Sequence, residues 1–221
     1  MKKFLIVTLL CMVLAGTMVP AAFAAGDTNY TQCMAVIKEQ RTVQDQAHKT
    51  AQALRKQGYK DSSAYVQAAK STYQEASQTI QKYQRLAKYS DEDIRILSTA
   101  VYHEAGTTTE QLRQYVAQVV LNRLSDSRFP DTIKEIITQP GQYSTKYASP
   151  ETTKAIQAKD AKNGTNYYAT CKNSVKQAMM GQVGMPTNVL YQANFTQGKG
   201  VWKSVHFDSG WYASTSYFCY G

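Results

Sequence analysis

The stretch "SDEDIRILSTAVYHEAG", residues 90–106, marks where the main folded domain begins. Ser90 can cap a helix whose first turn holds three acidic residues, which favours a helix start at this point. At 100° per residue, Leu97, Val101 and Glu104 fall on one side of that helix. We therefore expect Glu104 near the centre of a buried helix face, where a carboxyl group costs free energy unless something compensates.

Burial of this kind would raise the pKa of the Glu104 carboxyl toward neutrality. A carboxylic acid with a raised pKa, held on a rigid helix beside a cleft, suits a general acid. The residues leave two other interpretations open. One is a buried ion pair with a basic residue such as Arg123. The other is a helix that ends early and leaves Glu104 exposed beside Gly106.

The rest of the chain after Gly106 predicts a mainly α-helical domain with a small β part. Apolar residues recur at helical spacing in four further segments, residues 110–127, 129–144, 149–164 and 166–181. From Thr187 onward, short aromatic and β-branched stretches alternate with glycine turns, which predicts a small sheet or an irregular extended C-terminus. Roughly 130 residues suffice for one hydrophobic core.

Residues 25–89 have another composition and predict a basic helical hairpin. They are rich in Gln, Ala and Lys, and Gly58 interrupts two long stretches that favour helices. Asp61 or Ser62 can cap the second helix. The segment holds ten Lys/Arg and five Asp/Glu, so its net charge is +5. This charge favours an anionic partner such as an envelope polymer, lipid head groups or nucleic acid, or simply keeps a helical surface solvated.

The first residues predict export from the cytoplasm. "MKKFLIVTLLCMVLAGTMVPAAFAAG" joins two lysines to an apolar run and then to small residues, the pattern of a secretory signal peptide. The run is slightly short for a spanning helix, so we expect cleavage near Ala25, with an uncleaved anchor as the alternative. The expected organisation is a signal peptide at 1–24, the basic hairpin at 25–89 and a catalytic domain at 90–221. No second apolar run is expected to span a membrane.

The cysteines and histidines favour no metal site. Cleavage would remove Cys11 and leave Cys33, Cys171 and Cys219. Export permits disulfides, and Cys171 with Cys219 is a possible pair, although spacing leaves the connectivity open. No CxxC or Cys/His cluster has metal-ligand spacing, so we expect neither a zinc site nor another cofactor.

Four motifs in the second region carry a resemblance. Glu104 is followed by Ala-Gly, and "VVLNR" at 119–123, "RFPDTI" at 128–133 and "QPGQYS" at 139–144 follow in order. Together they resemble the catalytic domain of the SleB/CwlJ-type cell wall hydrolases, the spore cortex-lytic enzymes, over most of residues 92–221. The chain departs from the usual pattern at His103, where Ala is common, and at Ser216, near the place of a usual His.

The resemblance implies a lysozyme-like α fold that acts on peptidoglycan as a lytic transglycosylase. Glu104 would be the single catalytic residue, first protonating the glycosidic oxygen between N-acetylmuramic acid and N-acetylglucosamine. The muramic C6 hydroxyl would then attack C1 and give a 1,6-anhydro product without water. A glycosidase would normally use two carboxylates, and Asp126, Asp131 and Asp208 are the candidates for the second.

Glycan strands need amides and hydroxyls for their N-acetyl groups and aromatic faces for their sugar rings. We therefore expect Gln139, Gln142, Tyr143, Ser144 and Tyr191 to bind substrate. The resemblance and the predicted export together imply a secreted enzyme of the cell wall or spore envelope, with peptidoglycan as its partner and no nucleic acid. Anionic wall polymers are a candidate partner of the basic hairpin. The alternative is a non-catalytic protein that binds peptidoglycan or the spore envelope on the same scaffold.

Overall fold

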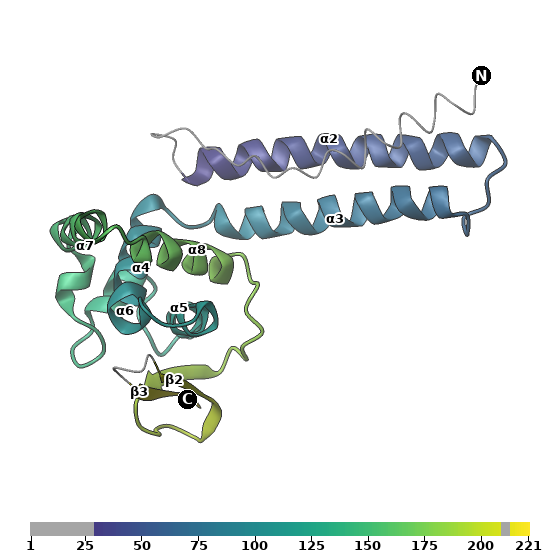
Figure 1. The fold of residues 1–221 in the computed structure, drawn as a ribbon. Coiled ribbons are helices and arrows are strands. Elements are labelled where there is room, and N and C mark those ends of the chain that lie inside the picture. Colours follow the sequence, from purple (N-terminus) through teal and green to yellow (C-terminus); the bar gives the residue numbers. More distant parts are fainter. Residues whose placement is uncertain (1–28, 209–212) are drawn as a thin grey trace. The chain divides into compact units, whose positions relative to one another are not determined.

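The computed structural model describes residues 29–208 and 213–221, and these residues are mainly helical (Figure 1). Two compact units follow each other along the chain: one ends at Lys88, and the other begins at Tyr89. The expected signal peptide at 1–24 lies outside the described residues. In the described part, no helix combines the length and the apolar character that a membrane span needs.

The first unit is a hairpin of two long helices, α2 (Asn29–Lys56) and α3 (Ala64–Leu86). Gly58 lies in the turn with φ +87°, a backbone conformation that glycine adopts without steric cost. The cap of α3 falls one residue later than expected. Ser63, rather than Asp61 or Ser62, accepts the hydrogen bond from a backbone N–H of the first turn.

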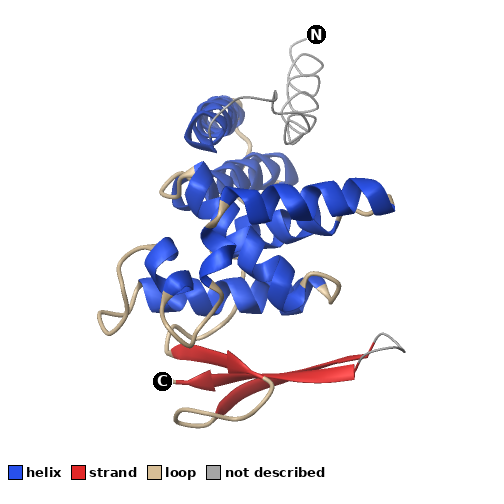
Figure 2. Ribbon diagram, turned by 90° about the vertical axis from the view of Figure 1, so that its left-hand side faces the viewer, coloured by secondary structure: helices blue, strands red, loops and turns tan. Residues whose placement is uncertain are grey.

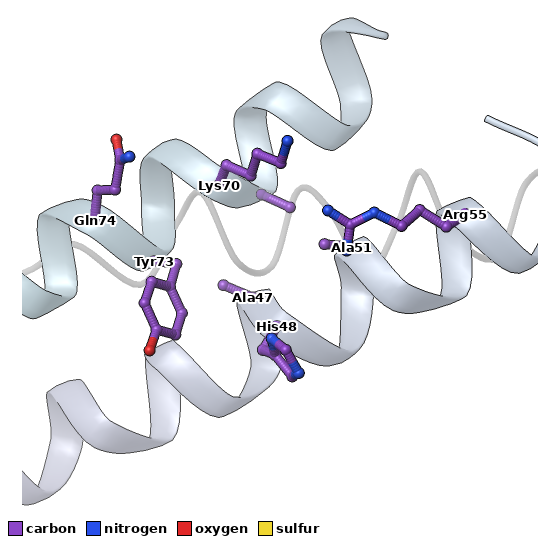
Figure 3. A pocket seen from close by; sticks show the side chains of 8 residues that line it. Ala47, His48, Ala51, Arg55, Lys70, Tyr73 and Gln74 are labelled. Carbon is purple, nitrogen blue, oxygen red and sulfur yellow. The ribbon is translucent and has the colours of Figure 1, made fainter. Parts of the chain in front are cut away.

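The contact between the two helices relies on small side chains. Buried apolar residues line it, namely Cys33, Val36, Ile37, Ala47, Ala51, Leu54, Val66, Ala69, Ala76, Ile80 and Leu86. Met34 and Tyr73, which the helical pattern would also place there, are 38% and 43% exposed. Because alanines meet in the part of the hairpin nearer the turn, they leave a hollow of about 180 Å³ between α2 and α3 (Figure 3).

The second unit combines five α-helices, one short 3₁₀ helix and a three-stranded sheet within its described residues. The helices are α4 (Asp91–Ala105), α5 (Glu110–Leu124), α6 (Ile133–Thr138), η2 (Thr145–Ala148), α7 (Pro150–Asn163) and α8 (Tyr167–Met179). The strands are β1 (Val189–Ala193), β2 (Val201–Asp208) and β3 (Ala213–Tyr220). Strand β3 is central and antiparallel to both neighbours, and Figure 2 shows the sheet on one side of this unit's helices. This confirms the predicted mainly α fold with a small β part.

The helix starts of the second unit follow the signals in the sequence. Ser90 accepts a hydrogen bond from the Asp93 N–H at 3.1 Å, and the Asp93 carboxylate accepts one from the Ser90 N–H at 2.9 Å. Thr109 caps α5, and Ser149 caps α7 with Pro150 at its first position. Side chains that satisfy free backbone N–H groups therefore fix where these helices begin.

Helix α4 is the central helix of the second unit. It packs against α5, α6, η2, α7 and α8. Every side chain from Ile96 to Val101 is buried, and Leu97, Ala100 and Val101 are fully so. Even Thr99, on the side away from Leu97, is buried, with its hydroxyl 2.8 Å from that of Thr153 on α7. Burial on all sides makes α4 a rigid support for its own last turn.

The three cysteines of the described chain are buried and form no disulfide. Cys171 lies in α8 and Cys219 in β3, and this possible pair forms no disulfide in the structure. Burial raises the pKa of the Cys171 thiol to about 11, so that thiol is protonated at neutral pH.

Candidate active site

Glu104 lies in the last turn of α4, and its side chain is exposed. This corrects the expectation of a carboxyl at the centre of a buried face. Val101 and Ala105 are buried and Tyr102 is half-buried, whereas the side chains of His103 and Glu104 between them are exposed. The alternative of an exposed Glu104 near the helix end describes the position better, although α4 continues through Ala105.

The exposed Glu104 carboxyl is nevertheless crowded by protein atoms. This partial burial raises the pKa of Glu104, and a hydrogen bond from the Tyr147 hydroxyl acts in the opposite direction. The hydroxyl lies 3.4 Å from Oε1 of Glu104, which is long for an O–H···O bond. A carboxyl that solvent reaches, and that still has a raised pKa, suits proton transfer to a ligand near neutral pH.

The alternative of an ion pair between Glu104 and Arg123 is not realised. Among the ion pairs of the described residues, none involves either side chain. Arg123 is only 3% exposed, and its Nε donates to the Leu190 carbonyl at 2.7 Å. Its Nη1 is buried without a hydrogen-bond partner in this part of the chain. Arg123 therefore holds β1 against α5 instead of neutralising Glu104.

Three aromatic rings surround the Arg123 guanidinium, and we call them the Arg123 cage. The guanidinium carbon lies 5.3 Å from the ring centre of Phe129 and 5.8 Å from those of Tyr143 and Tyr191. At these distances a cation attracts the faces of aromatic rings. The cage thus brings together two of the predicted substrate-binding residues, Tyr143 from the loop after α6 and Tyr191 from β1.

Tyr143 also connects the cage with Glu104. Burial raises the pKa of Tyr143 to about 12, the Arg123 charge opposes this rise, and the Glu104 charge adds to it. The Tyr143 hydroxyl is therefore neutral at neutral pH and lies within electrostatic range of Glu104. The Glu104 charge thus raises the pKa of Tyr143, which is one of the five predicted substrate-binding residues.

The three other predicted residues of the "QPGQYS" loop have different surroundings. Gln142 is exposed, so its amide is accessible to a ligand. Ser144 accepts a hydrogen bond from the Lys146 N–H at 3.4 Å and so caps η2. Gln139 has a buried Oε1 without a hydrogen-bond partner among the described residues. No hydrogen bond in this part of the chain joins any of the three to Glu104.

Sequence reasoning missed Tyr147 and the structural role of His103. Tyr147 lies in η2, and its ring stacks on the His103 imidazole with centroids 4.5 Å apart and planes inclined by 3°. An aromatic residue soon after "QPGQYS" is the only signal in the sequence. The contact depends on how the loop after α6 returns to the end of α4, which residue spacing does not indicate.

The three candidates for a second carboxylate have different surroundings. Asp126 forms an ion pair with Arg128 at 2.7 Å, and this partner lowers the pKa of Asp126 to about 2. Asp131 lies exposed before α6, and Asp208 ends β2. In the described ranges, no three His, Cys, Asp or Glu side chains are arranged to hold a metal ion.

The chain is similar to known cell wall proteins. Residues 107–212 match the family described as Cell Wall Hydrolase. A spore cortex-lytic enzyme of Halalkalibacterium halodurans is 33% identical over 93 residues, which are 37% of this chain and 28% of that protein. One of Oceanobacillus iheyensis is 39% identical over 56 residues, 25% and 20% of the two chains. One of Bacillus cereus is 32% identical over 81 residues, 34% and 31% of the two chains.

The family match lies in the second unit, and each relative matches only a part of this chain and a part of its own length. The chain spans between a fifth and a third of the length of these curated relatives. No solved structure gives a significant match to it. The family match begins at residue 107, so Glu104 stands just before the matched range and its role rests on its own geometry. The match and the named relatives confirm the resemblance seen in the motifs, which is to the cell wall hydrolase family over residues 107–212.

Proposed function

We propose that the second unit cleaves peptidoglycan, in the cell wall or the spore envelope, with Glu104 as its catalytic acid and base. The family match and the relatives named spore cortex-lytic enzyme support the substrate class. The observation that carries the proposal is the state of Glu104: its carboxyl is accessible to solvent and still has a pKa raised by surrounding protein. A general acid needs both properties, because it must reach the substrate and hold its proton.

The reaction we propose is that of a lytic transglycosylase. Glu104 donates its proton to the glycosidic oxygen as the bond from that oxygen to C1 of N-acetylmuramic acid breaks. The same carboxylate then takes the proton of the muramic C6 hydroxyl, whose oxygen bonds to C1. One carboxylate suffices for both transfers. The ion pair of Asp126 with Arg128 supports a mechanism with one carboxylate, because it removes one candidate for the second carboxylate of a glycosidase.

The substrate contacts follow from the surroundings of the loop residues. Tyr143 and Tyr191 are half-buried, and the Arg123 cage orients their rings, so they are prepared to pack against sugar rings. The exposed amide of Gln142 suits an N-acetyl group. Ser144 and Gln139 are expected to shape the same loop, Ser144 through its cap on η2 and Gln139 through its buried amide.

The test is digestion of purified sacculi and of spore cortex in water enriched in ¹⁸O, with products identified by mass spectrometry. A transglycosylase gives 1,6-anhydro ends that contain no ¹⁸O, since water is not consumed. A hydrolase gives reducing ends that carry ¹⁸O. Binding to sacculi without either product would contradict the proposal and favour a non-catalytic envelope protein on the same scaffold.

The hairpin is proposed to hold the enzyme on anionic wall polymers. It presents exposed basic side chains, among them Lys38, Arg41, Lys56 and Lys60. Replacing these four with Gln in the full chain should weaken binding to sacculi at low salt. The difference from the unchanged protein should vanish at high salt, because salt screens exposed charges. Equal binding of both proteins at low salt would contradict this role.

A further inference from the structure

The end of α4 and the 3₁₀ helix η2 bring three side chains into one series of contacts. The Tyr147 ring lies flat on the His103 imidazole, with centroids 4.5 Å apart and planes inclined by 3°. The hydroxyl of the same tyrosine lies 3.4 Å from Oε1 of Glu104. One aromatic ring therefore touches the imidazole with its face and the carboxyl with its hydroxyl, and we call this the His103–Tyr147–Glu104 series.

We propose that Tyr147 and His103 are positioning residues for Glu104: the Tyr147 hydroxyl selects the orientation of the carboxyl, and His103 holds the Tyr147 ring in place. The inference rests on the proposed function of Glu104 and extends it to two residues that no motif identified. Ala is common at this position in the family that the motifs resemble. It has no ring and could not stack on Tyr147 as His103 does.

The need for a positioning contact follows from where Glu104 lies. An exposed glutamate has several rotamers of similar energy, and holding one of them costs conformational entropy. A tyrosine ring has few rotatable bonds, so it can direct a hydrogen bond at low entropic cost. The stack on His103 restricts the ring further. The long O–H···O distance is typical of a catalytic contact that tightens only when substrate is bound.

Both aromatic partners have the protonation states that this arrangement requires. Burial, the Glu104 charge and the hydrogen bond to it all raise the pKa of Tyr147, which therefore remains a donor at neutral pH. Partial burial and the charge of Lys159 lower the pKa of His103. The imidazole is therefore neutral at neutral pH and stacks on Tyr147 without placing a cation beside the acid.

The titratable groups that face the series come from several elements. Tyr147 of η2 acts on Glu104, and Glu104 acts on Tyr143 of the preceding loop. Arg123 of α5 faces Tyr143, and Lys159 of α7 faces His103. Removing the Tyr147 hydroxyl takes away the interaction that lowers the pKa of Glu104, so that pKa should rise. Because the general acid must be protonated, the basic limb of the pH–rate profile should then move to higher pH.

The experiment uses the full chain with four variants, Tyr147→Phe, His103→Ala, His103→Phe and the double variant Tyr147→Phe/His103→Ala. The first readout is a ¹³C NMR titration of the Glu104 carboxyl, and it requires no enzymatic activity. The Glu104 signal is assigned by its absence from the spectrum of Glu104→Gln. The second is the rate of product release from sacculi as a function of pH. Tyr167→Phe, which removes the hydroxyl of a tyrosine on α8 that is 39% exposed, is the matched control.

Tyr147→Phe is expected to raise the titration midpoint of Glu104 and to slow the reaction by about fivefold to tenfold, as the loss of one ordinary hydrogen bond predicts. His103→Ala should slow it by about threefold to fivefold. His103→Phe keeps a flat ring and should restore most of that loss. If His103 acts through the Tyr147 hydroxyl, the double variant should be no slower than Tyr147→Phe alone.

Three results would overturn the inference: an unchanged Glu104 titration in Tyr147→Phe, a His103→Phe variant as slow as His103→Ala, or effects of the two positions that simply multiply. A failure of the proposed function looks different. In that case the unchanged protein releases no glycan product, while the titration still decides whether Tyr147 acts on Glu104.

Discussion

Asn122→Ala removes the buried amide that ties α5 to the segment leading into β1. Nδ2 of Asn122 donates to the carbonyls of Pro186 and Val189, both at 2.9 Å, and the residue is 2% exposed. The Pro186 carbonyl keeps a second hydrogen bond, from the Val189 N–H at 3.1 Å. The lost bond to the Val189 carbonyl is therefore the costlier of the two.

The magnitude follows from these two bonds. A typical hydrogen bond contributes about 1 kcal/mol net, and a buried carbonyl left without its partner costs about 1 to 3 kcal/mol. We expect Asn122→Ala to lower the free energy of unfolding by about 2 to 3 kcal/mol. Gln118→Ala is the matched control: its amide donates to Oδ1 of Asn122 at 2.9 Å from a half-buried position. It should cost about 0.5 to 1 kcal/mol.

Urea unfolding followed by tryptophan fluorescence measures this change. Both tryptophans of the chain, Trp202 and Trp211, follow Tyr89 in the sequence. Trp202 packs edge-to-face on the buried Tyr115 with ring centroids 5.2 Å apart, so its emission reports that core. The midpoint should fall by about 1 to 2 M urea for Asn122→Ala. A decrease no larger than that of Gln118→Ala would refute the reasoning.

Two further substitutions and one titration test other parts of the structure. Ser90→Ala breaks the capping box of α4 and should lower the free energy of unfolding by about 1 kcal/mol in the same assay. Gly106→Ala places a Cβ against the Tyr102 carbonyl and should cost about 1 to 2 kcal/mol, whereas an unchanged thermal midpoint would show that the chain relaxes freely there. Asp126 should titrate by NMR at about pH 2, because Arg128 stabilises its ionised form. Since its folded pKa is depressed, its contribution to stability should be present above roughly pH 4 and be lost as the pH falls toward 2.

The sequence predicted the helices of the second unit because their signals are local. Ser90, Thr109 and Ser149 cap helices through backbone groups two or three residues away, so the order of residues alone carries the information. The family motifs likewise lie in single short segments. The burial of Glu104 was predicted wrongly, because a helical wheel gives the direction of a side chain but not which parts of the helix the neighbouring elements cover.

The remaining parts of the site depend on contacts between distant segments. The Arg123 cage joins the end of α5, the loop after α6 and β1, and the stack of Tyr147 on His103 joins residues 44 positions apart. Spacing along one helix or strand has no bearing on such contacts. The hydrogen bond from Tyr147 to Glu104 depends on the path of the chain between α6 and η2, so the sequence alone did not predict it.

The most direct test of the central claim compares Glu104→Gln with Glu110→Gln in the release of muropeptides from sacculi. Glu110 is an exposed glutamate in the first turn of α5, so its substitution controls for the loss of one carboxylate. The account predicts that Glu104→Gln keeps its unfolding midpoint but loses at least about 100-fold in rate, the contribution expected of a general acid or base. Glu110→Gln should stay within about twofold of the unchanged protein. Equal rates for the two folded variants would contradict the assignment of Glu104 as the catalytic residue.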